Sequence, residues 1–352
     1  MCEKIQTVAG KLPKYWKCTL EDAEKAVGGI KKGTVEEFLS AGGRKIYRVF
    51  YGKKNEWQRT ANYSSAAGSR DIACYAKKDT PNYRPTLFLV GGIHGFEFEG
   101  SVALLNLISL IESGEDYAGN PHPILKMLNN INLIIIPYAN PDGRERVPLA
   151  TAVGVTLEEF RYYAQGTWAD GSLCDWPKCK TVHPMRGERA GHLGAYYNDD
   201  GINLMHDLFP FPVAEETKIL FDTVDEYVPD MTVLLHGGAS SETTILPPAA
   251  VHFSYIEETE KFSRQLAKRL ECEGLHMDVC EAAQVIADTG IPNYNLASAL
   301  TNTCGEVCIT YETNQGLDFE GTRLTLDEIY VHHMLLFEEL GRFVSEKNKN
   351  AQ

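Results

Sequence analysis

Short apolar runs rich in β-branched residues alternate along this chain with longer helical patterns, and this alternation limits the possible folds more than any other feature. Strands that are apolar on both faces belong in a sheet that is covered on both faces, as parallel strands usually are. The pattern therefore predicts an α/β fold with a mixed, largely parallel twisted sheet of about eight strands and helices on both faces. The strand-like runs are residues 45–52, 71–77, 86–92, 130–138, 231–237 and 307–313.

Helical patterns fill the intervals between these runs. Thr19 is a suitable N-cap for the pattern "TLEDAEKAVGG", and "GTVEEFLS" after it resembles a second short helix, so residues 1–45 are predicted to form a mostly helical lead-in. Residues 148–200 are rich in Tyr, Trp, Gly and Cys and have little periodicity, which is typical of a long functional surface excursion. No repeat or linker divides the chain, which indicates one domain over residues 1–352. The longer helical patterns are residues 98–114, 214–228, 255–274 and 324–347.

Composition narrows the classes of partner. The formal net charge of −14 argues against nucleic acid, because binding to phosphates needs a basic surface. No segment has the roughly 18 apolar residues that a membrane-spanning helix needs, and the N-terminus lacks the apolar region of a signal peptide. The nine cysteines are scattered, which suits reduced thiols. We therefore expect a cytoplasmic protein without nucleic-acid or membrane partners, and the sequence leaves its oligomeric state open.

The motif "GGIHGFEFEG" follows an apolar run and precedes a helical pattern. His94 and Glu97 lie three residues apart in a strand-to-helix turn, where side chains at the carboxyl end of a strand can converge on a ligand. The glycines allow tight turns and close approach of the backbone. The motif alone is compatible with an ordinary turn or with half of a metal site. Glu99 is better placed in the first turn of the following helix, where the helix dipole favours an acid.

Two later strand ends carry side chains of the same kind. His236 ends the run "MTVLLHGG" and Glu312 lies in "VCITYETNQG". Two histidines and one glutamate form a catalytic zinc set that leaves a position for water, and a further carboxylate would serve as the base for that water. The alternatives are a buried, hydrogen-bonded histidine and an acid that points to solvent.

The order of these motifs resembles that of the zinc metallocarboxypeptidases of the carboxypeptidase A type. The resemblance covers roughly residues 45–340 and includes the turn "NPDGR" after the run "INLIIIPY". It implies a single Zn²⁺ ion bound by His94, Glu97 and His236. It further implies that Glu312 is the general base that activates water and then protonates the leaving amine.

The same resemblance nominates arginines around the substrate. The segment "MRGER" is similar to the family's W-R-x-x-R segment, so Arg186 would stabilise the oxyanion and Arg189 would lie beside it as a substrate-binding residue. Arg144, a further substrate-binding candidate, and Arg146 are the reserve candidates for the oxyanion. An ordinary surface position is the alternative for each of these arginines.

The segment "DGINLMHDLF" departs from the family pattern. Asn203 aligns with it, but Met205 and His206 stand where the family has the Asn-Arg pair that binds a C-terminal carboxylate. His206 could bind that carboxylate more weakly, since histidine is only partly charged near neutral pH. Alternatively, Arg189 or Arg161 replaces the clamp, or the substrate presents something other than a peptide C-terminus. A second departure is a leucine two residues before His236, where many relatives have an aspartate.

Two further candidates come from loops. Tyr294, 18 residues before Glu312, is similar in place to the family's mobile substrate-binding tyrosine, although a packed or surface tyrosine is the alternative. A second metal site from Cys174, Cys179 and either His183 or His192 fits no strong spacing pattern, so a pocket wall or an oligomer contact is the preferred role of that segment.

Three classes of function remain, and they make different demands on the sequence. A zinc-dependent peptidase, most simply a carboxypeptidase acting on peptides, is preferred. An amidase or deacylase on the same scaffold, acting on small acylated amino acids or peptides, is the alternative that Met205 and His206 favour. A non-catalytic binding protein is the least favoured, because all three metal ligands and the base are present.

Overall fold

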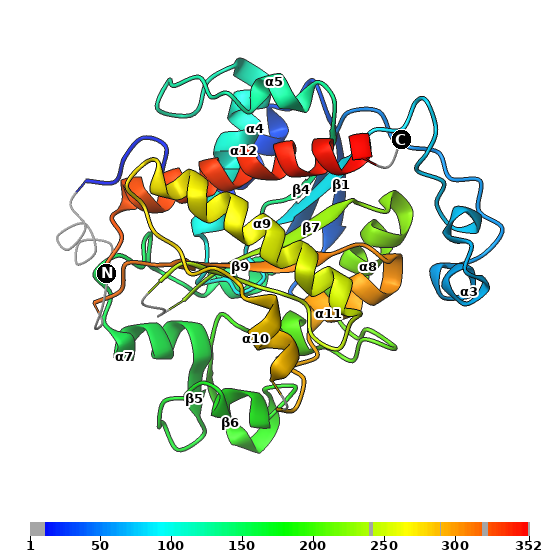
Figure 1. Ribbon diagram of the computed structural model, residues 1–352. Coiled ribbons are helices and arrows are strands. Elements are labelled where there is room, and N and C mark those ends of the chain that lie inside the picture. Colours follow the sequence, from blue (N-terminus) through cyan, green and yellow to red (C-terminus); the bar gives the residue numbers. More distant parts are fainter. Residues whose placement is uncertain (1–10, 239–241, 289, 319–322, 351–352) are drawn as a thin grey trace.

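The computed structural model describes residues 11–238, 242–288, 290–318 and 323–350. At its centre is a seven-stranded sheet in the order β1-β2-β4-β3-β7-β9-β8 (Figure 1). The central strands, each parallel to its neighbours in this group, are β4 (Asn132–Ile136), β3 (Thr86–Val90), β7 (Met231–Gly238) and β9 (Cys308–Asn314). The antiparallel strands at the edges are β1 (Thr34–Leu39), β2 (Lys45–Tyr51) and β8 (Thr244–Leu246). The predicted mixed, largely parallel sheet is confirmed, with seven strands among the described residues rather than about eight.

Helices cover both faces of this sheet, because alternate side chains of each central strand enter different apolar clusters. Leu87 and Leu89 of β3 belong to one cluster, whereas Phe88 and Val90 belong to the other. Figure 1 shows α9 and α12 in front of the sheet, where they pack against each other. The helices of the first cluster are α2 (Leu20–Gly28), α4 (Glu99–Ser113), α9 (Phe253–Glu271) and α12 (Leu326–Asn350). Those of the second are α3 (Tyr63–Ser69), α8 (Glu215–Tyr227) and α11 (Leu296–Cys304).

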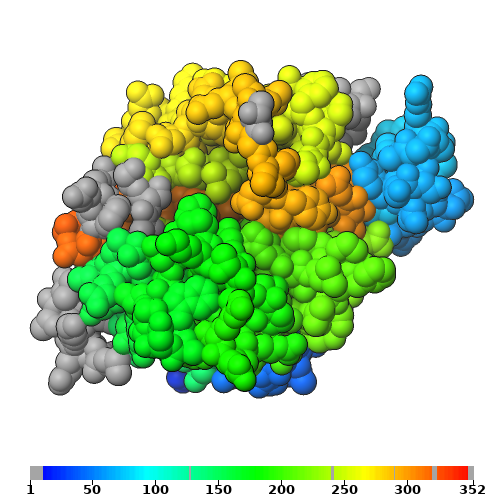
Figure 2. Space-filling view, turned by 90° about the horizontal axis from the view of Figure 1, so that it is seen from below, coloured from blue at the N-terminus to red at the C-terminus, as the bar shows by residue number. Residues whose placement is uncertain are grey.

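The excursion over residues 148–200 is built from short elements. Its two strands, β5 and β6, pair with each other in a separate antiparallel ribbon. Figure 2 shows its green surface on one side of the molecule, facing the yellow and orange surface of residues from about 250 to 300 across a hollow. The elements are α7 (Leu157–Phe160), η2 (Arg161–Gln165), β5 (Gly166–Trp168), η3 (Lys178–Thr181), η4 (Gly187–Arg189) and β6 (Ala190–Leu193). The remaining short helices are η1 (Ile72–Cys74), α5 (Leu125–Leu128), α6 (Pro141–Glu145), η5 (Leu204–His206) and α10 (Ala282–Ala287).

The lead-in is less helical than its sequence suggests. Thr19 caps α2 as predicted, in a capping box with Asp22. The expected second helix at residues 33–40 is wrong, because this segment forms β1 and pairs along its length with β2. A neighbouring strand that satisfies every second backbone group outweighs a weak helical preference. Residues 1–10 of the lead-in lie outside the described residues.

The expected strand at residues 71–77 is also wrong. Ile72–Cys74 form a turn of 3-10 helix, and the side chain of Ile72 is exposed. This segment pairs with no strand of the described sheet; Tyr75 N donates to Ile72 O within the turn, and the carbonyl of Cys74 accepts bonds from Thr60 N and Ala61 N.

None of the helices in the described part of the chain combines the length and the apolar composition that crossing a membrane requires.

Candidate active site

The candidate active site lies at the carboxyl ends of β3, β7 and β9, which are adjacent in the sheet. His94 and Glu97 belong to the turn between β3 and α4, and Glu99 lies in the first turn of α4 as predicted. His236 lies in β7, directly opposite Glu312 of β9 in the parallel ladder. Four side chains from distant parts of the sequence are therefore brought together by the parallel order of the sheet.

Two glycines allow the turn before Glu97 to form. Gly92 has φ +59°, a left-handed conformation that favours glycine. At Gly95, a Cβ atom would lie only 2.1 Å from the backbone nitrogen of Arg144, because the "NPDGR" turn packs directly against it. Asn140 caps that turn by accepting a bond from Gly143 N at 2.8 Å. The "NPDGR" motif thus packs against the turn that carries His94 and Glu97 and supports its conformation.

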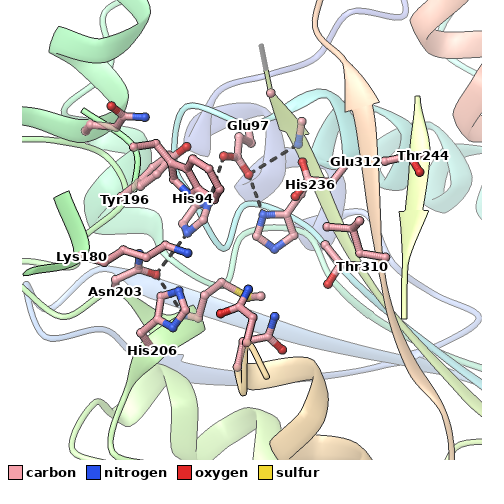
Figure 3. Close-up of a pocket in the computed structure, with 18 of the residues that line it drawn as sticks. His94, Glu97, Lys180, Tyr196, Asn203, His206, His236, Thr244, Thr310 and Glu312 are labelled. Carbon is pink, nitrogen blue, oxygen red and sulfur yellow. Dashed lines mark hydrogen bonds and ion pairs between the residues drawn. The ribbon is translucent and has the colours of Figure 1, made fainter. Parts of the chain in front are cut away.

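His94, Glu97 and His236 point toward one another (Figure 3). The Nδ1 atom of His94 lies 2.9 Å from Oε1 of Glu97, and Nδ1 of His236 lies 2.6 Å from Oε2. Their ligand atoms all fall within 4.8 Å of one another, and all three residues are buried. Although burial alone would raise the pKa of Glu97, the two histidines lower it to about 2, so the carboxylate is available as a ligand. Two imidazole nitrogens and one carboxylate are donors that suit zinc.

Neighbouring side chains orient the two histidines unequally. The Nε2 atom of His94 lies 3.1 Å from Oδ1 of Asn203, and the ring of Tyr196 stacks on the imidazole with centroids 4.0 Å apart. Donation from Nε2 to Asn203 leaves the lone pair of His94 Nδ1 for a metal. Nε2 of His236 is buried without a hydrogen-bond partner among the described residues. Leu234, at the position where many relatives have an aspartate, belongs to the second apolar cluster and offers no polar group.

Glu312 enters the same pocket from β9. Burial raises the pKa of its carboxyl to about 7, and the nearby His236 and Lys180 partly oppose this effect. A carboxyl group with a pKa in this range can both accept and release a proton near neutral pH.

The pocket has a volume of about 440 Å³ and contains the three candidate ligands and Glu312. Asn203, Met205 and His206 line it as the sequence suggested. Burial, with Lys180 and His94 nearby, lowers the pKa of His206 to about 3, so its imidazole is neutral near neutral pH. The lining residues not nominated from the sequence include Phe160, Gln165, Trp176, Lys180, Tyr196, Thr244, Leu246, Asn293, Asn295 and Thr310.

The structure does not bring the nominated arginines into this pocket. Arg186 and Arg189 are exposed, and neither lines it. Arg144 is buried and donates to the carbonyls of Cys18, Val147 and Leu149, at 2.8, 2.9 and 3.0 Å. These three bonds hold its guanidinium in the interior, and Arg144 does not line the pocket.

Arg146 and Arg161 are also engaged elsewhere. Arg146 bonds to Asp199 and to the carbonyl of Tyr197, and Arg161 pairs with Asp175 at 3.0 Å. Neither side chain lines the pocket. Arg146, the reserve candidate for stabilising the oxyanion, and Arg161, a proposed replacement for the arginine that binds the substrate carboxylate, therefore both lie outside the pocket.

Tyr294 does not line the pocket either, although its neighbours Asn293 and Asn295 do. Its side chain is 45% exposed and packs edge-on against Phe209, with ring centroids 5.9 Å apart.

The second metal site considered from the sequence finds no support among the described residues. They contain one group of three potential metal ligands, and it is the group of His94. His183 instead accepts a bond from Asn203 N at 2.9 Å, and His192 stacks on Tyr162. Cys174 and Cys179 are buried in the apolar core. The alternative role of this segment as a pocket wall agrees with Trp176 and Lys180, which line the pocket.

The lining residues that the sequence missed come from segments without periodicity or a recognisable motif. Phe160, Gln165, Trp176, Lys180 and Tyr196 all belong to the 148–200 excursion. The unusual composition of that excursion was a signal for the segment, but it could not single out individual residues.

The fold and the site together define a metal-dependent hydrolase of α/β architecture. The family model for zinc carboxypeptidases matches residues 39–248, more than half of the chain, and the protein belongs to this family. A single zinc ion is accordingly its cofactor, and the cluster of His94, Glu97 and His236 fits that ion.

Solved structures share the fold at low sequence identity. Thrombin-activatable fibrinolysis inhibitor aligns with a TM-score of 0.58 and 12% identity, covering 99% of this chain and 83% of that one. A metallo-carboxypeptidase from Burkholderia cenocepacia aligns with a TM-score of 0.54 and 12% identity, covering 93% and 70%. Carboxypeptidase A from Helicoverpa armigera aligns with a TM-score of 0.51 and 14% identity, covering 99% and 80%. No curated protein sequence matches the chain.

Proposed function

We propose that this protein hydrolyses peptide bonds as a zinc-dependent carboxypeptidase, with Glu312 as the general base. The observation that carries the proposal is the convergence of His94, Glu97 and His236 beside a fourth, buried carboxyl group in one pocket. With His94, Glu97 and His236 holding the metal, Glu312 would be the remaining carboxylate of the pocket and thus the one that can move protons.

Zinc, when bound, supplies a Lewis acid that polarises the carbonyl and makes water more acidic. Glu312 accepts one proton from the attacking water, whose oxygen forms a bond to the carbonyl carbon. The carbon–nitrogen bond then breaks, and Glu312 delivers its proton to the leaving nitrogen. Burial of Glu312 supports this role, because a carboxyl group shielded from solvent holds a proton more readily between the two transfers.

The substitution Glu312→Gln tests the base. It preserves shape but removes proton transfer, so we expect kcat to fall by at least about 10²-fold while bound zinc stays at one ion per chain. Glu158→Gln, at an exposed position of the nearby helix α7, is the matched control and should retain wild-type kcat. Near-native turnover by Glu312→Gln, or no zinc uptake by the wild-type protein, would refute the proposal.

A second candidate is an amidase or deacylase acting on small acylated amino acids or peptides. It is favoured by the lining of the described pocket, which contains no arginine. Met205 and His206 line the pocket at the positions where the family has the Asn-Arg pair that binds a C-terminal carboxylate. Carboxylates are held most firmly by a bidentate guanidinium. Peptides with a free C-terminus, the same peptides amidated, and N-acyl amino acids should be compared. Equal cleavage of free and amidated peptides would exclude a carboxypeptidase and favour this candidate.

A further inference from the structure

The described pocket contains a cation that no motif nominated. Lys180 lines it together with the metal ligands and Glu312, and it is the one lysine among the lining residues. No hydrogen bond or ion pair joins its ammonium to any described residue. An ammonium that is partly removed from water without a directly paired counter-charge lowers stability, so its position in the pocket calls for an anionic partner.

Lys180 is held in the pocket by a well-anchored segment. It belongs to η3, and its backbone nitrogen donates to the carbonyl of Pro177 at 3.0 Å. The preceding Cys179 is buried, and its carbonyl accepts a bond from the hydroxyl of Tyr197 at 2.9 Å. The ammonium lies 5.2 Å from the centre of the Trp176 ring, a distance at which a cation is attracted to an aromatic face. The charge is thus positioned without being neutralised.

The position of Lys180 relative to the reacting groups indicates its role. Figure 3 shows Lys180 reaching into the pocket beside His94, Asn203 and His206, with Glu312 beyond the metal ligands on the β9 side. A carbonyl attacked from the side of Glu312 accumulates negative charge on its oxygen, and a cation across the ligand cluster stabilises that charge. Lys180, His206 and Glu312 all line this one pocket.

We propose that Lys180 is the catalytic cation of this enzyme, and that it donates a hydrogen bond to the carbonyl oxygen of the scissile bond and stabilises the negative charge developing there. This inference rests on the proposed function, and it assigns to a lysine the task that the sequence suggested for Arg186. A compact ammonium suits a single oxygen, whereas a planar guanidinium suits a bidentate carboxylate. Lys180 retains all its protons throughout, since Glu312 carries the transferred one.

The test compares four variants of the zinc-loaded full chain on one peptide substrate, offered with a free and with an amidated C-terminus. Lys180→Met should lower kcat about 10²- to 10³-fold on every form that the wild type cleaves, the usual effect of losing an oxyanion donor. Lys180→Arg should recover at least about tenfold of that loss by restoring the charge. Lys178→Met, on the same short helix but exposed and outside the pocket, should match the wild type, as should Arg186→Ala.

A binding measurement provides a readout that does not depend on turnover. A phosphinic peptide mimics the tetrahedral oxyanion, so its affinity for zinc-loaded Lys180→Met should fall at least about tenfold, while zinc content stays at the wild-type value and the melting temperature does not fall below it. If Lys180→Met melts at a lower temperature, Lys180→Gln is measured in its place and should show the same losses.

Three outcomes would overturn the assignment. The first is an unchanged kcat in the variant that holds zinc. The second is a higher KM with unchanged kcat on free-acid peptides alone, which would make Lys180 a carboxylate receptor. The third is a kcat that is lower than the wild-type value in Arg186→Ala but not in Lys180→Met. A wild-type, zinc-loaded protein that cleaves no amide would instead refute the proposed function itself.

Discussion

The hydrogen bond between His94 and Asn203 should set the strength with which zinc is held. Oδ1 of Asn203 lies 3.1 Å from Nε2 of His94 and also accepts a bond from Met205 N at 3.0 Å. Asn203→Ala removes the one buried acceptor of both bonds, so the imidazole loses its fixed tautomer and orientation. Removing such a partner costs about 10- to 100-fold in metal affinity, or about 1.4–2.7 kcal/mol.

Chelator competition measures this change directly as a zinc dissociation constant. Asn203→Asp should bind zinc at least as tightly as the wild type, because a carboxylate accepts the same bond and adds charge. Asn293→Ala is the control, since Asn293 lines the same pocket but is exposed. A dissociation constant for Asn203→Ala within about twofold of the wild-type value would refute the argument that Asn203 positions His94.

Two further predictions concern stability. Gly95→Ala should lower the melting temperature and weaken zinc binding, because its Cβ would lie 2.1 Å from Arg144 N, whereas Gly68→Ala, with no atom within 4 Å, should be nearly neutral; equal melting temperatures would contradict this. Burial alone would raise the pKa of Glu306, but Lys78 and Lys347 lower it below its ordinary value of 4.5. The ion pairs of Glu306 therefore stabilise the fold above pH 4.5. The free energy of unfolding should fall as the pH drops below that value. Lys78→Met should cost roughly 2 kcal/mol at pH 7, with a smaller difference at pH 4 in urea titrations; a constant difference would refute the pairing.

Local patterns were sufficient where the chain follows regular rules. β3 and β4 are runs of buried, mostly apolar residues that only a covered sheet can hold, and α2 has its capping box within four residues of sequence. Those patterns failed where a partner strand decided the outcome. The segment 33–40 lacks a strong apolar period, and its pairing with β2 makes it a strand. The segment 71–77 has no such partner and forms a short 3-10 turn.

The sequence by itself pointed to the candidate metal centre and its neighbour Glu312, because these residues end or follow strand-like runs and parallel strands bring their carboxyl ends to one edge. Only the tertiary structure decided which cation faces that centre. Arg186 and Lys180 lie six residues apart in a segment without periodicity, and nothing local distinguishes an exposed side chain from one that lines the pocket. Their orientation depends on how the excursion packs against the body of the protein, through contacts such as the bond from Tyr197 to the carbonyl of Cys179. Long-range packing of this kind places Lys180 in the pocket and leaves Arg186 in solvent.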